Sequence, residues 1–239
     1  MCIIVVKPIG KKLPTDGTLR QCWRNNPDGA GYMYRGNNGL IHIEKGFMSV
    51  DGLLKSLREL KESTDITLIT VVIHFRTATH GEIAPGNTHP FPLSRHRPDL
   101  IATSIDTDIA IAHNGVISVD IVREKLSDTM TFIKTVSDND VNTLLKALEG
   151  TGSKFAVAVG SLNRIHTVGY FHDNEGIQYS NTGFRDYTTE FKMWAPTQYD
   201  GGIWRYKKWE YQEDKQEEKD TRRKKHKKWE YHDEYTYCF

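Results

Sequence analysis

The sequence has few cysteines and no long apolar run, and each shortage excludes a class of protein. Its three cysteines are Cys2, Cys22 and Cys238, and so small and odd a number argues against a disulfide framework and favours a reducing compartment. No apolar stretch approaches the roughly 20 residues that a membrane-spanning helix needs. The apolar start MCIIVVKPIG has no basic region before it and no small-residue cleavage site after it, unlike a signal peptide. We therefore expect a cytoplasmic protein.

An excess of charge of one sign is also missing. The 32 Lys and Arg residues nearly balance 31 Asp and Glu residues, which gives a formal net charge of +1. The chain as a whole is therefore not biased toward nucleic acid or a membrane surface. With 239 residues it can bury a real core. Its apolar residues are dense up to about position 195 and sparse afterwards, which predicts one sizeable domain with an appendage.

The appendage is charged and segregated. Residues 205–239 contain eleven Lys/Arg and nine Asp/Glu, with the acidic block EYQEDKQEEKD followed by the basic block RRKKHKK, and the string KKWEY occurs twice. We predict a domain over 1–204 and a solvated, helical or flexible extension over 205–239. A segment that docks on a partner or on a second protomer is an alternative. A nucleic-acid-binding arm is disfavoured because the acidic block would repel phosphate.

Hydrophobic spacing predicts strands, then helices, then strands. Strands are expected at 2–6, 31–34, 40–44, 67–75 and 108–113, a helix at 49–62, three further helices at 118–126, 128–136 and 139–148, and closing strands at 154–160, 164–170 and 176–180. This order predicts an α+β fold in which two sheets are covered by helices.

Cys2 is the first candidate for chemistry. Removal of Met1 would leave a chain whose first residue carries both a thiol and a free α-amino group. An α-amino group has a pKa of about 7.7–8.0, so it can take the thiol proton and later deliver a proton to a leaving group. One residue would then supply nucleophile and base. The alternative is that Cys2 is a small buried hydrophobe in an edge strand.

Polar residues gather behind the predicted strand 67–75. In HFRTATHG, residues 74–81, Arg76 is suited to grip a carboxylate through two parallel hydrogen bonds. Thr79 and His80 would supply further hydrogen bonds nearby.

A second polar group follows the predicted strand 108–113. There the Asn114 side-chain amide precedes the Gly115 N–H, and such a pair of donors is what an oxyanion hole needs. The alternative for these residues is a tight turn. Asp128, in SDT, stands at a predicted helix start and would ordinarily be an N-cap.

Six short motifs follow one another along the chain. They are Met-Cys at the start, NPDGAGY at 26–32, H-x-R-x-A-T-H-G at 74–81, N-x-H-P at 87–90, HNG at 113–115 and SDT at 127–129. Together and in this order they resemble the class II glutamine amidotransferases, which are N-terminal nucleophile hydrolases with a glutaminase domain. The resemblance covers roughly residues 1–185. It implies a four-layer αββα sandwich of the N-terminal nucleophile hydrolase type.

The resemblance also implies a catalytic role for three residues. Cys2 matches the nucleophile that attacks the side-chain amide of glutamine, forms a γ-glutamyl thioester and releases ammonia. Asn114, through its side chain, and Gly115, through its N–H, match the oxyanion hole. No cofactor and no metal are implied.

Substrate binding is implied for four further residues. Arg76 matches the residue that binds the α-carboxylate of glutamine, and Asp128 matches the carboxylate that receives its α-ammonium group. Thr79 and His80 match the loop that lines this pocket. The chemistry agrees, because a free amino acid needs one cation and one anion to hold its two charged ends.

The sequence departs from the family pattern in three ways. Thr77 stands where members often carry a tryptophan, which puts coupling to an ammonia acceptor in doubt more than hydrolysis. Met1 must be removed to free the α-amino group of Cys2. The chain has no room for a fused synthase domain, so we expect a stand-alone glutaminase. Either its ammonia goes to an acceptor on a partner synthase, which the charged extension recruits, or it hydrolyses glutamine or γ-glutamyl compounds itself.

Two alternatives remain. One is a non-catalytic binding or regulatory module that kept the fold, although such a module would be free to lose Cys2, Arg76 or Asn114, and all are present. The other is a metalloenzyme built on the histidines of the two polar stretches, His74, His80, His89 and His113. No familiar two-histidine metal spacing occurs among these, so we expect no metal.

Overall fold

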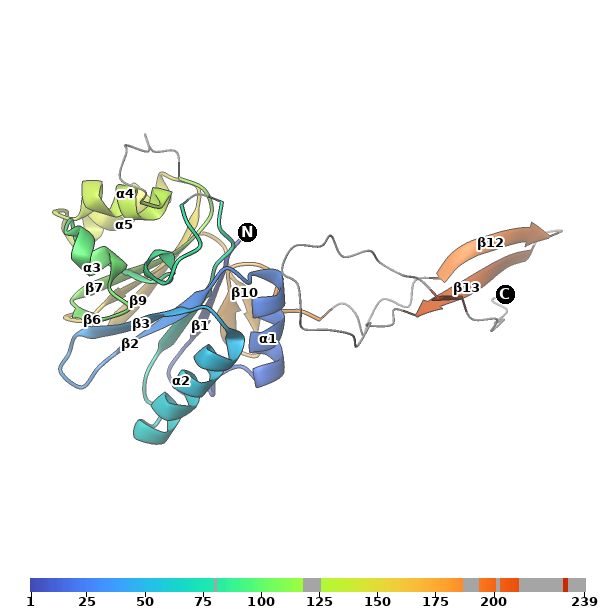
Figure 1. Ribbon diagram of the computed structural model, residues 1–239, viewed down its shortest axis with the longest axis horizontal. Coiled ribbons are helices and arrows are strands. Elements are labelled where there is room, and N and C mark those ends of the chain that lie inside the picture. The colour runs from blue at the N-terminus through green and yellow to red at the C-terminus, as the bar shows by residue number, and fades with distance from the viewer. Residues whose placement is uncertain (80, 118–125, 187–193, 201–202, 211–229, 232–239) are drawn as a thin grey trace. The chain divides into compact units, whose positions relative to one another are not determined.

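A computed structural model describes residues 1–79, 81–117, 126–186, 194–200, 203–210 and 230–231 (Figure 1). The chain divides into two compact units, Met1–Arg185 and Asp186–Phe239. The first unit contains every predicted site residue. Among the described residues, no helix combines the length and the apolar character needed to cross a bilayer.

The first unit has an α+β fold. Its helices are α1 (Asp16–Asn25), α2 (Val50–Ser63), the short 3-10 helix η1 (Pro85–Asn87), α3 (Arg97–Ile101), α4 (Asp128–Val136) and α5 (Val141–Glu149). Its strands are β1 (Ile3–Lys7), β2 (Ala30–Arg35), β3 (Ile41–Phe47), β4 (Val71–Phe75), β5 (Phe91–Pro92), β6 (Ser104–Thr107), β7 (Ile109–Asn114), β8 (Lys154–Val159), β9 (Arg164–Val168), β10 (His172–Asn174) and β11 (Ile177–Tyr179).

The strands of this unit form two antiparallel sheets. The larger has seven strands in the order β10-β11-β1-β4-β2-β3-β6, and the smaller has four in the order β5-β7-β8-β9. β1 lies inside the larger sheet, where Ile3 pairs with Phe75 of β4 and Val5 pairs with Tyr179 of β11. The first strand of the chain is therefore held from both sides by strands that come much later.

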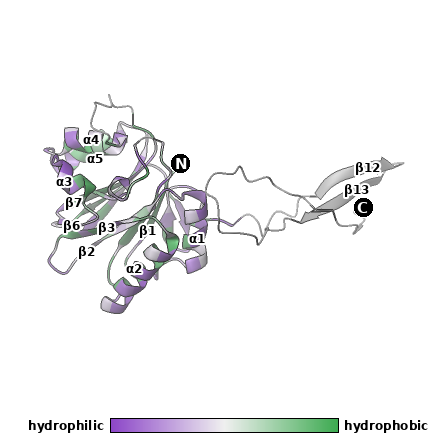
Figure 2. Ribbon diagram, in the orientation of Figure 1, coloured by the Kyte–Doolittle hydropathy of each residue, from purple (hydrophilic) through white to green (hydrophobic). Residues whose placement is uncertain are grey.

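Three apolar clusters form the core of this unit. One lies where α1 and α2 pack on the larger sheet and includes Leu19, Leu53 and Leu57. A second lies where α4 and α5 pack on the smaller sheet and includes Met130 and Leu144. The third joins the two sheets through large apolar residues of the larger one and alanines of the smaller one: Ile4, Val6, Met33, Ile41, Ile43, Val72, Ala110, Ala112, Ala156 and Ala158. Figure 2 shows this distribution, with apolar strands and helices of mixed character.

Alternation within each strand explains how one sheet serves two clusters. In β1, Ile3 and Val5 face α1 and α2, whereas Ile4 and Val6 face the smaller sheet. Successive side chains of a strand point to opposite faces. A strand buried on both faces is mostly apolar, and β1 is buried throughout and apolar from Ile3 to Val6, with Lys7 at its end.

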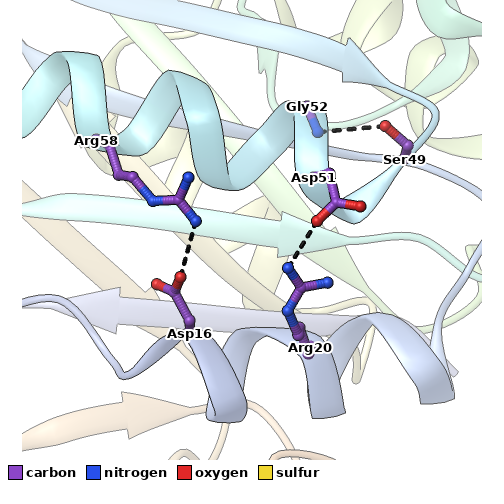
Figure 3. Close-up of polar contacts among 6 residues, drawn as sticks. All are labelled: Asp16, Arg20, Ser49, Asp51, Gly52 and Arg58. Atoms are coloured by element: carbon purple, nitrogen blue, oxygen red, sulfur yellow. Dashed lines mark hydrogen bonds and ion pairs between the residues drawn. The ribbon is translucent and has the colours of Figure 1, made fainter.

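Side-chain caps start the main helices. Thr15, Ser49, Ser127 and Asp140 each accept a hydrogen bond from a backbone N–H in the first turn of α1, α2, α4 and α5. These bonds satisfy donors that a helix leaves unpaired. Helices α1 and α2 are also joined by two exposed ion pairs, Arg20–Asp51 at 2.6 Å and Arg58–Asp16 at 2.9 Å (Figure 3).

Most of the predicted elements are present, with shifted ends. The strand predicted at 67–75 begins only at Val71, because the preceding residues form a turn in which the Asp65 carboxylate accepts from the N–H and hydroxyl of Thr67. Helix α1 and strand β6 were not predicted from the sequence. Most of the helix predicted at 118–126 lies outside the described residues.

The second unit contains strands in its described part. β12 (Trp194–Asp200) and β13 (Ile203–Glu210) pair antiparallel, and β14 (Glu230–Tyr231) pairs with the end of β13. The paired residues Glu210 and Glu230 belong to the two KKWEY copies. The first unit ends at Arg185, before the boundary predicted at 204, and residues 203–210 form a strand where the sequence suggested a helical or flexible extension.

Candidate active site

Cys2 lies directly before β1, at the end of the larger sheet where several other candidate residues gather. Its sulfur accepts a hydrogen bond from the Thr77 N–H at 3.3 Å, and its thiol donates to the Thr77 carbonyl at 3.5 Å. The Cys2 carbonyl accepts from the Asn181 side chain at 2.7 Å. Burial raises the pKa of the thiol, while the Thr77 N–H, the positive chain terminus and Arg76 act in the opposite direction. Cys2 is therefore a thiol, and not a thiolate, near neutral pH.

A small cavity adjoins the Cys2 side chain. It is lined by Cys2, Arg76, Thr77, Thr79, His89, His113, Gly115, Ser127, Asp128 and Thr129. Five of the seven site residues predicted from the sequence are in this set. Its volume is about 20 Å³, which is close to the space that one water molecule needs. An amino acid is much larger than this space.

Arg76 follows β4 and is almost fully buried. Its guanidinium donates to the Glu82 carbonyl at 3.0 Å. Burial lowers the pKa of Arg76, and the neighbouring Cys2, Asp28 and Asp128 raise it. An arginine stays protonated through a shift of this kind, so it brings a positive charge to the cavity.

The NPDGAGY motif braces the segment after β4. The Asp28 carboxylate accepts from the Ala78 N–H at 2.8 Å, and the Asn26 side-chain oxygen accepts from the Thr77 hydroxyl at 2.9 Å. The Asp28 N–H in turn donates to the Arg76 carbonyl at 3.0 Å. This motif therefore fixes the backbone that carries Arg76 and contacts Cys2.

Two glycines of the same motif allow close packing. A Cβ atom on Gly31 would collide with the His89 carbonyl oxygen and with Lys45. Gly29, at φ +113°, would place a Cβ 2.5 Å from the Thr88 side chain. The N-x-H-P segment, which contains the cis peptide His89–Pro90, can therefore lie directly against β2. Glycine is required at both positions for this contact.

Asn114 and Gly115 lie where β7 ends. The Asn114 side chain is 4% exposed, and its Nδ2 lies 2.8 Å from the Ser180 hydroxyl oxygen. Its Oδ1 has no hydrogen-bond partner within the described residues. Gly115 lines the cavity, whereas Asn114 does not. A Cβ on Gly115 would collide with the Ser153 side chain, so this backbone position accepts only glycine.

Asp128 is the first residue of α4 and is 6% exposed. Its Oδ2 accepts from the Ile117 N–H at 3.1 Å, and its Oδ1 accepts from the Thr129 N–H at 2.8 Å. The expected N-cap role falls to Ser127, whose hydroxyl accepts from the Met130 N–H. A carboxylate can accept about four hydrogen bonds, so Asp128 keeps capacity for a cationic group in the cavity.

Three histidines form the buried floor of the cavity region. His74 and His89 stack with ring centroids 4.2 Å apart, and His113 lies 6.2 Å from His89. The His74 Nε2–H donates to the His113 carbonyl, and His89 Nδ1 accepts from the His113 N–H. Burial lowers the pKa of His74 to about 3 and that of His113 to about 4, and it lowers the pKa of His89 well below its usual value. The floor is therefore uncharged at neutral pH.

His113 is also connected to Asp128. Its Nδ1 lies 2.8 Å from the Thr129 hydroxyl, which lies 3.4 Å from the Asp128 Oδ1. The hydroxyl can accept from the imidazole and donate to the carboxylate, which leaves His113 Nε2 as a lone pair. This series of contacts holds Asp128 against β7.

Two predicted site residues remain, Thr79 and His80, and the structure describes only the first. Thr79 lines the cavity and its side chain is exposed. His80 lies outside the described residues. Among those residues, no group of three His, Cys, Asp or Glu side chains is arranged to hold a metal ion.

Three contributors to the site were not identified from the sequence. Ser180 and Asn181 contact Asn114 and Cys2 but stand far from every motif. Asp28 lies within NPDGAGY, yet its bond to the Ala78 N–H depends on the neighbouring loop. Each signal is a lone polar residue beside a strand or turn, which is too common to mark a site. Comparison of the sequence with protein-family models and with curated proteins found no match.

Proposed function

We propose that this protein hydrolyses the side-chain amide of glutamine through Cys2, giving glutamate and ammonia, as a glutaminase of the class II amidotransferase type. One observation carries the proposal. Cys2, Arg76, Gly115 and Asp128, which are far apart in the sequence, line the same cavity. These are a nucleophile, a cation, a backbone N–H donor and an anion. The resemblance assigns these same positions to the reaction.

The reaction begins with a proton transfer. The Cys2 thiol is protonated near neutral pH because burial raises its pKa, so attack needs a base. The α-amino group of Cys2 supplies that base once Met1 is removed. The thiolate then attacks the amide carbon, and the carbonyl oxygen becomes an oxyanion. The Gly115 N–H and the Asn114 amide are the proposed donors to it.

Collapse of this intermediate releases ammonia. The carbon–nitrogen bond breaks as the α-ammonium group of Cys2 returns the proton to the leaving nitrogen. A γ-glutamyl thioester remains. Water, deprotonated by the same amino group, attacks the thioester carbon and releases glutamate and the free thiol. Arg76 pairs with the α-carboxylate of glutamine and Asp128 with its α-ammonium group throughout.

The fold that we propose for the first unit is the four-layer αββα sandwich of the N-terminal nucleophile hydrolases. Three features support it: α1 and α2 pack on the larger sheet, α4 and α5 pack on the smaller sheet, and the two sheets share the third apolar cluster. In this arrangement the nucleophile stands at the start of an inner strand, as Cys2 does.

The ammonia goes to an acceptor, which we propose lies on a partner synthase. The charged residues 205–239 are the proposed recruiting segment. Truncation after Trp204 should leave the glutaminase rate unchanged and weaken the complex with the synthase. Loss of glutaminase activity in a folded truncated chain would instead assign this segment to the active site.

A second candidate is a binding or regulatory module without catalysis. The raised pKa of the buried Cys2 thiol favours it, because a protonated thiol is a poor nucleophile. The two candidates differ in a simple property, since only the enzyme turns over glutamine in a Cys2-dependent way.

The deciding experiment combines intact mass and ammonia release on one preparation. Chain that has lost Met1 and releases ammonia from glutamine, with no release from Cys2→Ala, supports the glutaminase. Cys22→Ala is the matched control, because Cys22 is buried in α1 among apolar residues and should leave turnover unchanged. Processed chain without turnover would favour the binding module. Chain that keeps Met1 must first be processed to begin at Cys2 and then be assayed again.

A further inference from the structure

The Asn114 amide and the Ser180 hydroxyl form a buried contact between the two sheets. Asn114 ends β7 of the smaller sheet, and Ser180 follows β11 of the larger one. The two side chains lie 2.8 Å apart. The Ser180 oxygen also accepts the N–H of Ile4 in β1 at 2.8 Å, and its side chain is fully buried. Solvent water therefore does not reach this contact and cannot replace either partner.

The donors and acceptors of Ser180 and Asn114 limit which hydrogen bonds this contact can make. A hydroxyl has one proton to donate and two lone pairs, and an amide has one oxygen and two N–H bonds. With the amide nitrogen toward Ser180, the hydroxyl accepts from Asn114 and from Ile4. Its own proton then has no acceptor among the described residues, and the Asn114 oxygen has no donor there. Two buried polar groups are left unsatisfied, which is costly.

Half a turn of the amide about its last torsion satisfies the Ser180 proton and the Asn114 oxygen, and it leaves the NH2 group as the donor without an acceptor among the described residues. The Ser180 hydroxyl then donates to the Asn114 oxygen while still accepting from the Ile4 N–H. Nitrogen and oxygen of an amide are nearly equal in size, so neighbouring atoms need not move. The NH2 group now points away from Ser180 and offers its N–H bonds to a new acceptor.

We propose that Ser180 is a positioning residue, which holds the Asn114 amide by its oxygen and so leaves its NH2 group free for the oxyanion. The catalytic role of Ser180 rests on the proposed glutaminase function. The orientation of the Asn114 amide rests on the proton count. It adds a residue that no motif of the resemblance includes. Ser180 touches neither the cavity nor the sulfur of Cys2, so it acts only through Asn114 and β1.

The neighbouring residue extends this role to the nucleophile. The Asn181 side chain donates to the Cys2 carbonyl at 2.7 Å, and its own oxygen accepts from the Gly183 N–H at 2.9 Å. The Ser180 N–H donates to the Ile4 carbonyl at 2.9 Å. The two residues after β11 therefore set the position of Cys2 and the orientation of Asn114 together.

The kinetic test uses full chain that begins at Cys2. We expect Ser180→Ala to lower kcat for glutamine by about 10- to 100-fold, less than or comparable to the loss of an oxyanion donor itself. KM should change by less than about 2-fold, because Arg76 and Asp128 hold the substrate ends. Ser180→Cys, with a weaker donor of similar size, should lie between. Ser56→Ala removes a hydroxyl that lies 2.7 Å from the Tyr32 hydroxyl, away from the site, and should change neither constant. A folded Ser180→Ala protein with the parental kcat overturns the proposal.

Neutron diffraction of deuterated parental crystals gives a second readout that needs neither a variant nor activity. A deuterium attached to the Ser180 oxygen and directed at the Asn114 side chain supports the proposal. A deuterium attached to the Asn114 nitrogen and directed at Ser180 overturns it, whatever the kinetics show. This map decides the matter even if the chain does not hydrolyse glutamine, so failure of the proposed function and failure of this inference are distinguishable.

Discussion

The N–H of Thr77 lies 3.3 Å from the sulfur of Cys2, and the Thr77 carbonyl oxygen lies 3.5 Å from the same sulfur. A single peptide residue thus offers a donor to the thiolate and an acceptor to the thiol. Both protonation states of the nucleophile therefore have a backbone partner. Both partners are backbone atoms, and the Thr77 hydroxyl supports them indirectly by donating to the Asn26 side chain.

The reactivity of Cys2 toward iodoacetamide should keep rising above pH 9. The thiolate is the reactive form, and burial raises the thiol pKa above its ordinary value of 9.0. Removal of Met1 brings a positive amino group onto the same residue, so the profile of processed chain should lie at lower pH. Peptide-level mass spectrometry separates Cys2 from Cys22. Burial raises the pKa of Cys22 to about 12, so Cys22 should react more slowly. A plateau of the Cys2 rate below pH 8 would contradict this.

Acid should destabilise the fold through the buried histidines. His74 has a pKa lowered to about 3 and His113 to about 4, against 6.5 in the unfolded chain. The unfolded chain therefore binds more protons between these values. Stability is fully present above pH 6.5 and is lost as pH falls toward 4 and 3, by up to about 1.4 kcal/mol per pH unit for each histidine.

Urea unfolding between pH 7.5 and 4.5 measures this slope, with pH steps of about one unit. His74→Gln, which keeps a donor for the His113 carbonyl, should reduce the slope. His172→Gln, at the edge strand β10, is the matched control and should leave it unchanged. Equal slopes in the parental chain and in His74→Gln would show that His74 does not stay neutral in the folded state.

Two glycine substitutions should act in opposite directions. Gly31→Ala should lower the free energy of unfolding by about 3 kcal/mol, because its Cβ meets the His89 carbonyl, which cannot rotate away. Gly17→Ala, in the first turn of α1, has its nearest neighbour 3.7 Å away and should raise the free energy of unfolding by about 0.5–1 kcal/mol. Thermal and urea unfolding of both variants check the prediction. A neutral Gly31→Ala would mean that β2 and the N-x-H-P segment separate readily.

The Arg58–Asp16 pair between α1 and α2 should contribute little to stability. Both side chains are more than half exposed, at 58% and 59%, and exposed pairs are typically worth about 0.2–1 kcal/mol. A double-mutant cycle with Arg58→Ala and Asp16→Ala should give a coupling energy within that range, and high salt should reduce it. A coupling energy above about 2 kcal/mol would assign the docking of α1 on α2 to charge and not to the leucine cluster.

Sequence reasoning predicted elements with strong periodicity and missed those without it. The helix α4 agrees with its prediction at both ends, because Ser127 caps it and its apolar face is regular. Strand β6 (SIDT) is an edge strand with alternating exposed residues, so it has no apolar signal. Helix α1 buries only Leu19 and Cys22, and its cap at Thr15 alone did not identify it.

The candidate site was predicted from ordered motifs and not from single residues. Arg76 or Asp128 taken alone does not indicate a site. The order of the six motifs along the chain, in contrast, resembles that of the class II glutamine amidotransferases. Ser180 could not be found this way, because its contacts depend on β11 pairing with β1 and on β7 lying beside them. Such contacts follow from tertiary packing, which periodicity does not report.

The pairing of β1 with β11 has a consequence for the timing of synthesis. Ile4 and Ser180 are 176 residues apart, and a ribosome adds about 5–20 residues per second. The start of the chain therefore waits about 10–40 seconds before its second neighbouring strand exists. During that interval one edge of β1 is unpaired, and an aminopeptidase can reach Met1 before Asn181 fixes the backbone of Cys2. The order of the strands in the chain thus leaves an interval in which the proposed nucleophile can be processed before it is enclosed.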